Sequence, residues 1–351
     1  MHTVAVVGAG KIGEVLLSGL VRAGWPVDRL IATTRRPDRG RELTERYGVR
    51  VLPNEAAAVE ADVLAIAVKP QDAEALMVDL GPKVPTGKLV ISLCAGLPTS
   101  FFARFLSPGT PVVRVMTNTP ALVDEAMTAI SAGPHATAAH LALAEELFSP
   151  LGRTLRLPES QQDAVTALSG SGPAYFFYLV EAMTDAGILL GLPRQVAHDL
   201  IVQTAIGSAI MLRESGEHPV KLREAVTSPA GTTIAAIREL ENHAVRAALV
   251  GPGGGEGPRR GDRGRQRVAR RILRDLGLLS MPWHRPKSKI REKGGDSLRY
   301  SPLLLSVVDH LRFTDQWLGG RPKGMGGGGD ANTASARRVE QAVTSARAAR
   351  R

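Results

Sequence analysis

Apolar residues in the first 157 positions gather in short continuous runs, separated by polar stretches with apolar positions at helical spacing. Ile12, Val15, Leu16 and Leu20 show that spacing directly after the first run. Continuous apolar strands that alternate with helices are typical of a parallel sheet covered on both faces. The runs that predict strands are Thr3–Val7, Leu30–Thr33, Val63–Val68, Lys88–Leu93, Val112–Val115 and Met127–Ser131.

The pattern changes after position 157, where the β-branched runs disappear and long helical patterns follow. Glycine and proline lie at the joins between these patterns. We therefore predict an α/β chain, with an N-terminal Rossmann-type doubly wound parallel sheet over residues 1–157 and an all-α substrate and dimerisation domain over residues 158–250. The predicted long helices are Ala174–Leu190, Gln195–Ser215 and Thr232–Val250.

The tail, residues 251–351, differs from the rest in composition. It holds 22 Lys and Arg against 9 Asp and Glu, whereas residues 1–250 hold 22 against 25, so the net charge of +10 arises from the tail alone. Segments rich in glycine, proline and arginine rarely bury enough apolar surface to offset chain entropy. We predict that the tail is disordered or the product of a shifted reading frame. No specific nucleic-acid partner is expected, because aromatic residues are few and no zinc or helix-turn-helix signature is present.

Cysteine use and hydropathy bear on the compartment. A single cysteine, Cys94, excludes an intrachain disulfide framework and fits a reducing environment. The sequence shows no signal peptide, and no apolar run approaches the ~20 residues of a membrane helix. These features predict a cytoplasmic protein without a membrane partner.

A glycine-rich turn follows the first predicted strand. Gly8, Gly10 and Gly13 form the pattern G-x-G-x-x-G between a strand and a helix. In dinucleotide-binding folds the first glycine permits a tight turn, the second lets the pyrophosphate approach the backbone, and the third permits close packing of helix on strand. The turn therefore predicts a nicotinamide dinucleotide cofactor.

The end of the second predicted strand indicates which cofactor is used. A carboxylate there would hold the ribose 2′-hydroxyl of NADH, but the chain has Thr33-Thr-Arg-Arg36. The Thr34 hydroxyl and the guanidinium groups of Arg35 and Arg36 suit a 2′-phosphate. We predict NADPH, with NADH as a weaker cofactor. The alternative is that Arg35 and Arg36 are solvated turn charges.

Two further stretches, Asp163–Ala174 and Val226–Thr233, are rich in small and hydroxyl residues and run into helical sequence. Turns of this kind expose backbone N–H groups at the positive end of a helix, which is an arrangement that holds a carboxylate or a phosphate. Together with a dinucleotide site upstream, they predict a reductase of a small acid.

Five motifs stand in order along residues 3–249: Gly8–Gly13, Ala67–Gln71, Arg114–Ala121, Leu168–Tyr175 and Glu224–Thr233. In this order they resemble the motifs of the pyrroline-5-carboxylate reductases. The resemblance implies NADPH-dependent reduction of 1-pyrroline-5-carboxylate, a cyclic imine with one carboxylate, to proline. It also implies a homo-oligomer, a dimer or a ring of dimers, whose active site lies between the cofactor domain and the dimer helices.

The resemblance assigns roles to individual residues, and no metal site is among them. Ser228, Gly231, Thr232 and Thr233 would hold the substrate carboxylate. Besides Gly8, Gly10, Gly13 and Arg36, the residues that would line the cofactor are Lys11, Ile12, Thr34, Arg35, Asn54, Ala67, Val68, Lys69, Pro70, Cys94, Ala95 and Gly96.

Thr117 and Ala230 depart from the family pattern. Thr117 stands where the family usually has proline, and Ala230 where it often has glycine. Threonine restores a backbone donor, and alanine tolerates a positive φ less well than glycine.

The implied reaction asks the protein to hold and orient its reactants, because the cofactor supplies the hydride. Orientation of this kind can supply ~7–11 kcal/mol of a barrier. Our candidate catalytic residue is Thr233, whose hydroxyl would lie next to the imine nitrogen; the alternative is a helix N-cap, which is compatible with that role. Other functions left open are another NADPH-dependent imine or 3-hydroxyacid reductase, and a non-catalytic NADPH-binding protein with a nucleic-acid-binding tail.

Overall fold

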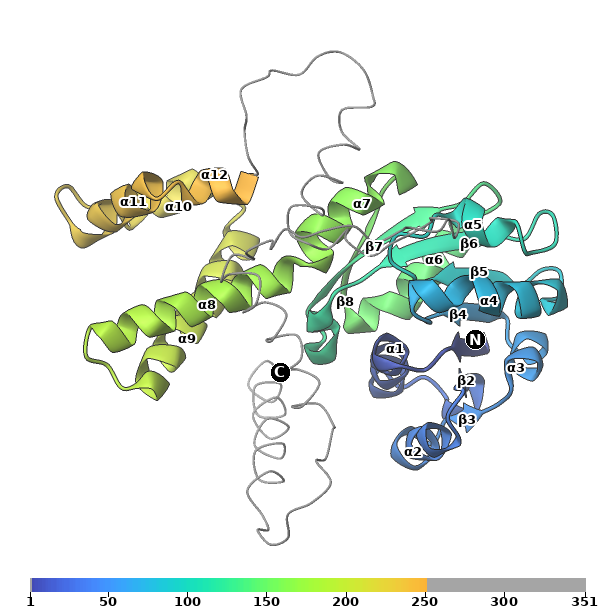
Figure 1. Cartoon of the computed structure of the whole chain (residues 1–351). Coiled ribbons are helices and arrows are strands. Elements are labelled where there is room, and N and C mark those ends of the chain that lie inside the picture. Colours follow the sequence, from blue (N-terminus) through green and yellow to red (C-terminus); the bar gives the residue numbers. More distant parts are fainter. Residues whose placement is uncertain (1, 251–351) are drawn as a thin grey trace, which may run out of the picture. The chain divides into compact units, whose positions relative to one another are not determined.

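The computed structural model describes residues 2–250, and the expectations for the tail fall outside this range. The first part of the chain forms one sheet with helices on its faces (Figure 1). Its strands lie in the order β3-β2-β1-β4-β5-β6-β7-β8. They are β1 (Val4–Val7), β2 (Leu30–Thr33), β3 (Arg50–Val51), β4 (Val63–Ile66), β5 (Leu89–Ser92), β6 (Val112–Met116), β7 (Ala126–Ala132) and β8 (Gly152–Arg156).

Three clusters of buried apolar residues pack on this sheet, two large and one small. Leu16 and Phe148 belong to one large cluster, Met77 and Phe102 to the second, and each is at most 1% exposed. Strands β1, β2, β4 and β5 are buried at every position, which explains why they read as continuous apolar runs. The helices of this part are α1 (Lys11–Arg22), α2 (Pro37–Tyr47), α3 (Asn54–Glu60), α4 (Pro70–Leu80), α5 (Thr99–Ala103) and α6 (Ala138–Phe148).

The register of the central strands aligns their carboxyl ends. Val7 of β1 pairs with Thr33 of β2 on one side and with Ile66 of β4 on the other, and Ile66 pairs with Ser92 of β5. All these pairings are parallel. The loops that follow the four strands therefore emerge at one edge of the sheet, and the order of strands reverses between β1 and β4. In sheets of this type, ligands bind at that reversal.

The sheet is not parallel throughout. The predicted last strand, 127–131, exists as β7 but runs antiparallel to β6, with Val115 opposite Ile130. Strands β3 and β8 were not predicted, because β3 has only two residues and β8 is a half-exposed edge strand with charged positions. Neither carries the apolar run that identifies a buried strand.

The remaining described elements are helical. Helices α8 and α9 pack together where Gly187 lies against Ala197: a Cβ on Gly187 would approach the Ala197 Cβ to 2.7 Å. None of the helices within residues 2–250 has the length and apolarity of a membrane span. The elements are α7 (Gln162–Val165), a π-helical turn (Thr166–Gly170), α8 (Gly172–Leu189), α9 (Arg194–Ser215), α10 (Pro219–Ala225), α11 (Thr232–Asn242) and α12 (Val245–Val250).

The prediction of one helix over Thr232–Val250 is wrong. The helix ends at Asn242, and Ala244 adopts φ 54°, so the chain turns before α12 begins. An apolar pattern at helical spacing continues across the break, and neither glycine nor proline marks it in the sequence. The segment Pro219–Ala225 was also missed as a helix because it has only seven residues.

A buried cation anchors the segment that connects the two parts. Arg114 on β6 is 5% exposed, and its guanidinium lies 3.4 Å from Asp163 and 3.7 Å from Glu159. Glu159 also accepts hydrogen bonds from the backbone N–H and the hydroxyl of Thr99, at 2.6 and 2.8 Å. These contacts tie the segment after β8 to the interior of the sheet.

We expect Arg114→Met to lower the free energy of unfolding by about 2 kcal/mol, because the partly buried Glu159 carboxylate and the exposed Asp163 carboxylate lose their buried cation. Arg156→Met is the matched control. Arg156 lies on β8 of the same sheet, and its exposed guanidinium is paired with Glu145 of α6. Thermal and denaturant midpoints measure both variants. Equal losses would contradict the assigned anchoring role of Arg114.

Candidate functional site

The turn after β1 is held by β2. The Gly8 N–H donates to the Thr33 hydroxyl oxygen at 3.1 Å, and the Ala9 N–H donates to the Thr33 carbonyl at 2.8 Å. Gly8 adopts φ 87°, which glycine reaches without strain. The turn thus leaves β1 sharply and leads directly into α1, whose first helical residue is Lys11.

The three glycines of this turn have different surroundings. A Cβ at Gly8 would approach the Val68 side chain to 2.4 Å, and a Cβ at Gly13 would approach the Gly8 carbonyl and the Val6 side chain to 2.9 Å. At Gly10, nothing lies within 4 Å of the position of a Cβ. Gly8 and Gly13 are therefore required for close packing, and Gly10 leaves an open approach to the backbone. This cradle fits the pyrophosphate of a dinucleotide.

The edge of the sheet brings most of the predicted cofactor residues together. Thr34 follows β2, Ala67–Pro70 follows β4 and Cys94–Gly96 follows β5, beside the glycine turn after β1. Asn54 is the first residue of α3, a short helix after β3. Residues at this edge that are exposed or partly exposed are Gly8, Gly10, Lys11, Ile12, Thr34, Arg35, Arg36, Val68, Lys69, Pro70, Ala95 and Gly96.

Cys94 and Ala67 are buried, at 2% and 5% exposure, as is Gly13 within the glycine turn. The Cys94 thiol lies 3.4 Å from the Val68 carbonyl oxygen, and burial raises the pKa of this thiol to about 11. A thiol with such a pKa is protonated at neutral pH and is a poor nucleophile. Cys94 therefore has a packing role, in which its side chain contacts the loop after β4.

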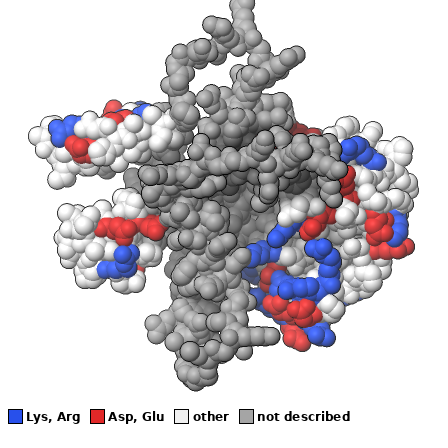
Figure 2. Space-filling model, in the orientation of Figure 1, with Lys and Arg blue, Asp and Glu red and all other residues white. Residues whose placement is uncertain are grey.

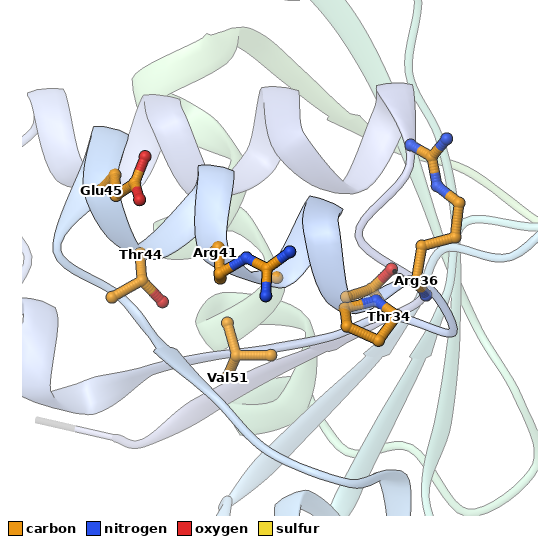
Figure 3. Close-up of a pocket in the computed structure, with 8 residues that line it drawn as sticks. Thr34, Arg36, Arg41, Thr44, Glu45 and Val51 are labelled. Carbon is orange, nitrogen blue, oxygen red and sulfur yellow. Dashed lines mark hydrogen bonds between the residues drawn. The ribbon is translucent and has the colours of Figure 1, made fainter.

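The loop between β2 and α2 carries Arg35 and Arg36. Arg35 is exposed and forms an ion pair with Asp72 at 3.2 Å. Arg36 precedes the first residue of α2, and its backbone N–H donates to the Thr34 hydroxyl oxygen at 3.3 Å. Thr34 and Arg36 border a hollow of about 400 Å³ beside α2, shown in Figure 3.

A polar cluster joins α1 to α2 and was not predicted. Glu14, directly after the glycine turn, is paired with Arg39 and with Arg46, and accepts a hydrogen bond from the Tyr47 hydroxyl at 2.9 Å. The Arg39 Nε–H also points at the Ala9 carbonyl oxygen, at 3.5 Å. Burial, followed by the hydrogen bond to Glu14, raises the pKa of Tyr47 to about 12. The cluster fixes α2 against the glycine turn.

Only the position of Glu14 in the first helical turn hinted at this cluster in the sequence. An acid there is favoured by the positive helix end, but its partners lie 25 to 33 residues away, beyond the reach of a local pattern.

The predicted substrate turn lies between α10 and α11. The Gly231 N–H donates to the Ser228 carbonyl at 3.1 Å, and the Ser228 hydroxyl packs so closely on Gly231 that a Cβ there would come within 2.4 Å of it. The first intrahelical bond of α11 runs from the Ala235 N–H to the Gly231 carbonyl. No side chain caps the helix, so the N–H groups of Thr232 and Thr233 are available to an anion.

The alternative role of Thr233 as a helix cap is wrong. The N-cap position belongs to Gly231, and Thr233 is the second residue of the helix, half-buried. Its hydroxyl therefore has no capping bond to make. Ala230, the departure from the family pattern, adopts φ 56°.

The stretch 163–174 is not the open turn that its composition predicts. Apart from a bend at Ser171 it is helical, through α7, the π-helical turn and the start of α8, and the Ser171 N–H donates to the Thr166 carbonyl at 2.9 Å. Asn118 clamps the π-helical turn, because its amide donates to the Ser169 carbonyl at 3.2 Å and accepts from the Met127 N–H at 3.1 Å. Residues 163–174 are therefore held to the segment after β6 and to β7 by Asn118.

Thr117, the second departure from the family pattern, is buried at 9% exposure. Its hydroxyl lies 2.9 Å from that of Thr128 on β7, so the side chain has a partner that proline would lack. The substitution is accommodated by a hydrogen bond to the neighbouring strand.

Within residues 2–250, no hydrogen bond or ion pair joins the turn 228–233 to the sheet. No group of three His, Cys, Asp or Glu side chains there is placed to hold a metal ion. The visible helical surface in Figure 2 is mostly uncharged. Large apolar side chains of the helical part are 45% to 89% exposed, namely Phe176, Phe177, Met183, Leu189, Leu190, Leu200, Ile206, Met211, Ile234 and Leu240. Such a surface marks a protein–protein contact.

Comparisons with known proteins agree with this architecture. The family pattern for pyrroline-5-carboxylate reductase dimerisation matches residues 159–251, and that for coenzyme F420-dependent NADP oxidoreductases matches residues 3–96. A pyrroline-5-carboxylate reductase of Corynebacterium melassecola is 43% identical over 71% of this chain and 94% of its own length. That of Mycobacterium tuberculosis is 44% identical over 71% of this chain and 92% of its own length.

Among solved structures, a pyrroline-5-carboxylate reductase from Coxiella burnetii superimposes with a TM-score of 0.69 at 31% identity, covering 78% of this chain and 98% of that one. The glycine cradle and the helical domain thus define an oxidoreductase with a nucleotide-binding sheet and an appended dimerisation domain. More narrowly, the chain belongs to the pyrroline-5-carboxylate reductase family.

We expect Ala230→Gly to stabilise the protein by about 0.5–1 kcal/mol, because a left-handed conformation costs a non-glycine residue about 1–2 kcal/mol and glycine's greater freedom in the unfolded chain offsets part of the gain. Ala235→Gly, inside α11, is the control with the opposite sign, since glycine costs a helix interior about 1 kcal/mol. Thermal midpoints of the two variants decide. A loss of stability in both would refute the strain at Ala230.

Proposed function

We propose that this protein reduces 1-pyrroline-5-carboxylate to proline with NADPH, the last step of proline biosynthesis. The observation that carries the proposal is the 43–44% identity to pyrroline-5-carboxylate reductases over more than nine-tenths of their length. The site agrees with it, because the sheet supplies a dinucleotide cradle and α11 supplies an uncapped helix start for one carboxylate.

The substrate carboxylate binds at the start of α11. The N–H groups of Thr232 and Thr233 and the Ser228 hydroxyl provide donors, and the positive helix end favours the negative charge. Gly231 keeps this turn tight, because a side chain there would collide with Ser228. A single anion seat orients a small ring with one carboxylate.

The cofactor lies across the carboxyl edge of the sheet. Its pyrophosphate approaches Gly10, and the predicted loops, including Asn54 and Lys69, line its path. Once bound, NADPH supplies the hydride for the imine carbon. Thr34 and Arg36 face the 2′-phosphate that distinguishes NADPH from NADH, and Arg35 adds charge at the rim.

Thr233 is the residue that we assign to the imine nitrogen. Its hydroxyl is not used as a cap, and it lies one residue into the helix that seats the carboxylate. From this position the Thr233 hydroxyl would form a hydrogen bond with the imine nitrogen and so help to orient the substrate ring toward the cofactor.

The functional unit is a homo-oligomer, either a dimer or a ring of dimers. Support comes from the match to the family's dimerisation domain and from the exposed apolar surface of α8, α9 and α11. The substrate seat and the cofactor edge carry no mutual hydrogen bond within one described chain, so we propose that the active site forms between the cofactor domain of one subunit and the helices of its partner.

The domain limits and the compartment belong to the same proposal. We place the cofactor domain at residues 1–157, the helical domain at 158–250 and the compositionally distinct tail at 251–351. The last strand ends at Arg156, which fits the first boundary. The compartment is the cytoplasm, and no specific nucleic acid is a partner.

The direct test is to mix the full-length protein with NADPH and 1-pyrroline-5-carboxylate, follow the loss of NADPH absorbance and quantify proline. We expect one proline for each NADPH consumed. Acyclic 3-hydroxyacids with NADP⁺ serve as the competing substrate class. Turnover of these, with none of the imine, would assign the protein to a different reductase class.

We expect Thr233→Val to lower kcat at least about tenfold, because the substitution keeps the shape of the side chain and removes the hydroxyl. Thr232→Val is the matched control for the hydroxyl: it makes the same change on the adjacent, more exposed residue, whose proposed contact with the carboxylate comes from the backbone N–H that valine keeps. Steady-state kinetics with saturating NADPH separate kcat from KM. A kcat for Thr233→Val within about threefold of wild type removes Thr233 from the chemistry.

We expect alanine at Arg35 and Arg36 together to raise the KM for NADPH about tenfold or more and to change that for NADH little, because charge-assisted hydrogen bonds to the phosphate are lost. Arg36→Ala alone should have the larger effect, since Arg35 is already paired with Asp72. Comparing the two Michaelis constants measures this. An unchanged NADPH value means that both arginines are solvated turn charges.

A further inference from the structure

The hollow beside α2 holds a second arginine that the sequence did not single out. Its lining includes Thr34, Arg36, Arg41, Glu45 and Val51. Within residues 2–250, the side chains of Arg36 and Arg41 have neither a hydrogen bond nor an ion pair, in contrast to Arg35. Two arginines without a partner that line one hollow can provide positive charge for an anion.

The hollow begins where the nucleotide turn ends. Thr33 holds the turn through the Gly8 and Ala9 N–H groups, and the next residue, Thr34, already lines the hollow. In this fold the ribose 2′ position lies at the end of β2. An anion in the hollow is therefore contiguous with the 2′ position of a dinucleotide held by the glycine turn.

The two ends of the hollow differ in charge. In Figure 3, Arg41 lies between Glu45 at one end and Thr34 with Arg36 at the other. The Arg41 guanidinium extends toward Thr34, whereas the Arg36 guanidinium points away from Arg41. Glu45 repels an anion from the far end. The Thr34 hydroxyl oxygen accepts the Arg36 N–H at 3.3 Å, which leaves its own proton to donate. The favourable position for a phosphate is the Thr34 end.

We propose that Arg41 is a specificity-determining residue that binds the 2′-phosphate of NADPH together with Arg36 and Thr34. The proposal rests on the proposed function for the identity of the cofactor. Arg41 reaches this position because α2 runs back along β2 and β3, where Gly40 packs closely: a Cβ there would lie 3.2 Å from the Val51 side chain. Arg41 follows Gly40 and lines the hollow.

The test measures binding by the full-length protein rather than turnover. Titrations of NADPH and NADH are followed by nicotinamide fluorescence, and adenosine 2′,5′-bisphosphate, which carries the phosphate without the nicotinamide, is titrated by calorimetry. For Arg41→Met we expect the Kd of NADPH and of the bisphosphate to rise about tenfold, with that of NADH changed less than about twofold. Glu45→Gln should lower the Kd of the bisphosphate, because it removes a negative charge from the hollow.

Arg50→Met is the control, because Arg50 lies next to Val51 but its guanidinium is paired with Glu60 and does not line the hollow. It removes the same charge nearby, and we expect it to leave the NADPH-to-NADH ratio of Kd values unchanged. Equal effects of Arg41→Met and Arg50→Met would overturn the proposal, as would an Arg41→Met effect of equal size on NADPH and NADH.

Failure of this inference is distinguishable from failure of the proposed function. If the wild-type protein reduces 1-pyrroline-5-carboxylate while Arg41→Met keeps the wild-type cofactor preference, the inference alone is wrong. If the wild-type protein leaves the imine unreduced while Arg41→Met weakens the bisphosphate and not NADH, the phosphate seat stands without the proposed substrate.

Discussion

Parallel pairing of β1 with its neighbours is the constraint on which the cofactor site depends. Val7 pairs with both Thr33 and Ile66, so the turns after three strands begin at one level, on either side of the point where the strand order reverses. The strand register alone brings these turns together, so no contact between the loops themselves is needed. The buried strands make that register costly to shift, since a one-residue slip would turn each strand's two faces over.

The polar contacts around this edge are arranged to support it. Thr33 carries the glycine turn, the Glu14 cluster fixes α2 against that turn, and buried Cys94 lies under the loops after β4 and β5. The helical part follows another principle. Many of its large apolar side chains are exposed to solvent in the single described chain. Such exposure is expected of a domain that packs against a second copy of itself.

Local patterns in the sequence identified what depends on neighbouring residues. The buried strands were predicted from their continuous apolar runs, the glycine turn from the spacing of its glycines, and the long helices α8 and α9 from their helical periodicity. The antiparallel β7, the break at Ala244 and the helical nature of 163–174 were not, because strand direction, a positive φ on alanine and a π-helical turn leave no composition signal. Arg41 was missed as well, since only the folded position of α2 brings it beside Thr34.

The most direct measurement is the fate of an isotopic label. NADPH carrying deuterium at the transferable position of the nicotinamide is supplied to the full-length protein with 1-pyrroline-5-carboxylate, and proline is examined by mass spectrometry and NMR. A carboxylate seat and a dinucleotide edge that serve one hydride transfer predict a single deuterium on the former imine carbon of proline. Proline without the label, or label transferred only to a different substrate, would contradict the assignment of this protein as an imine reductase.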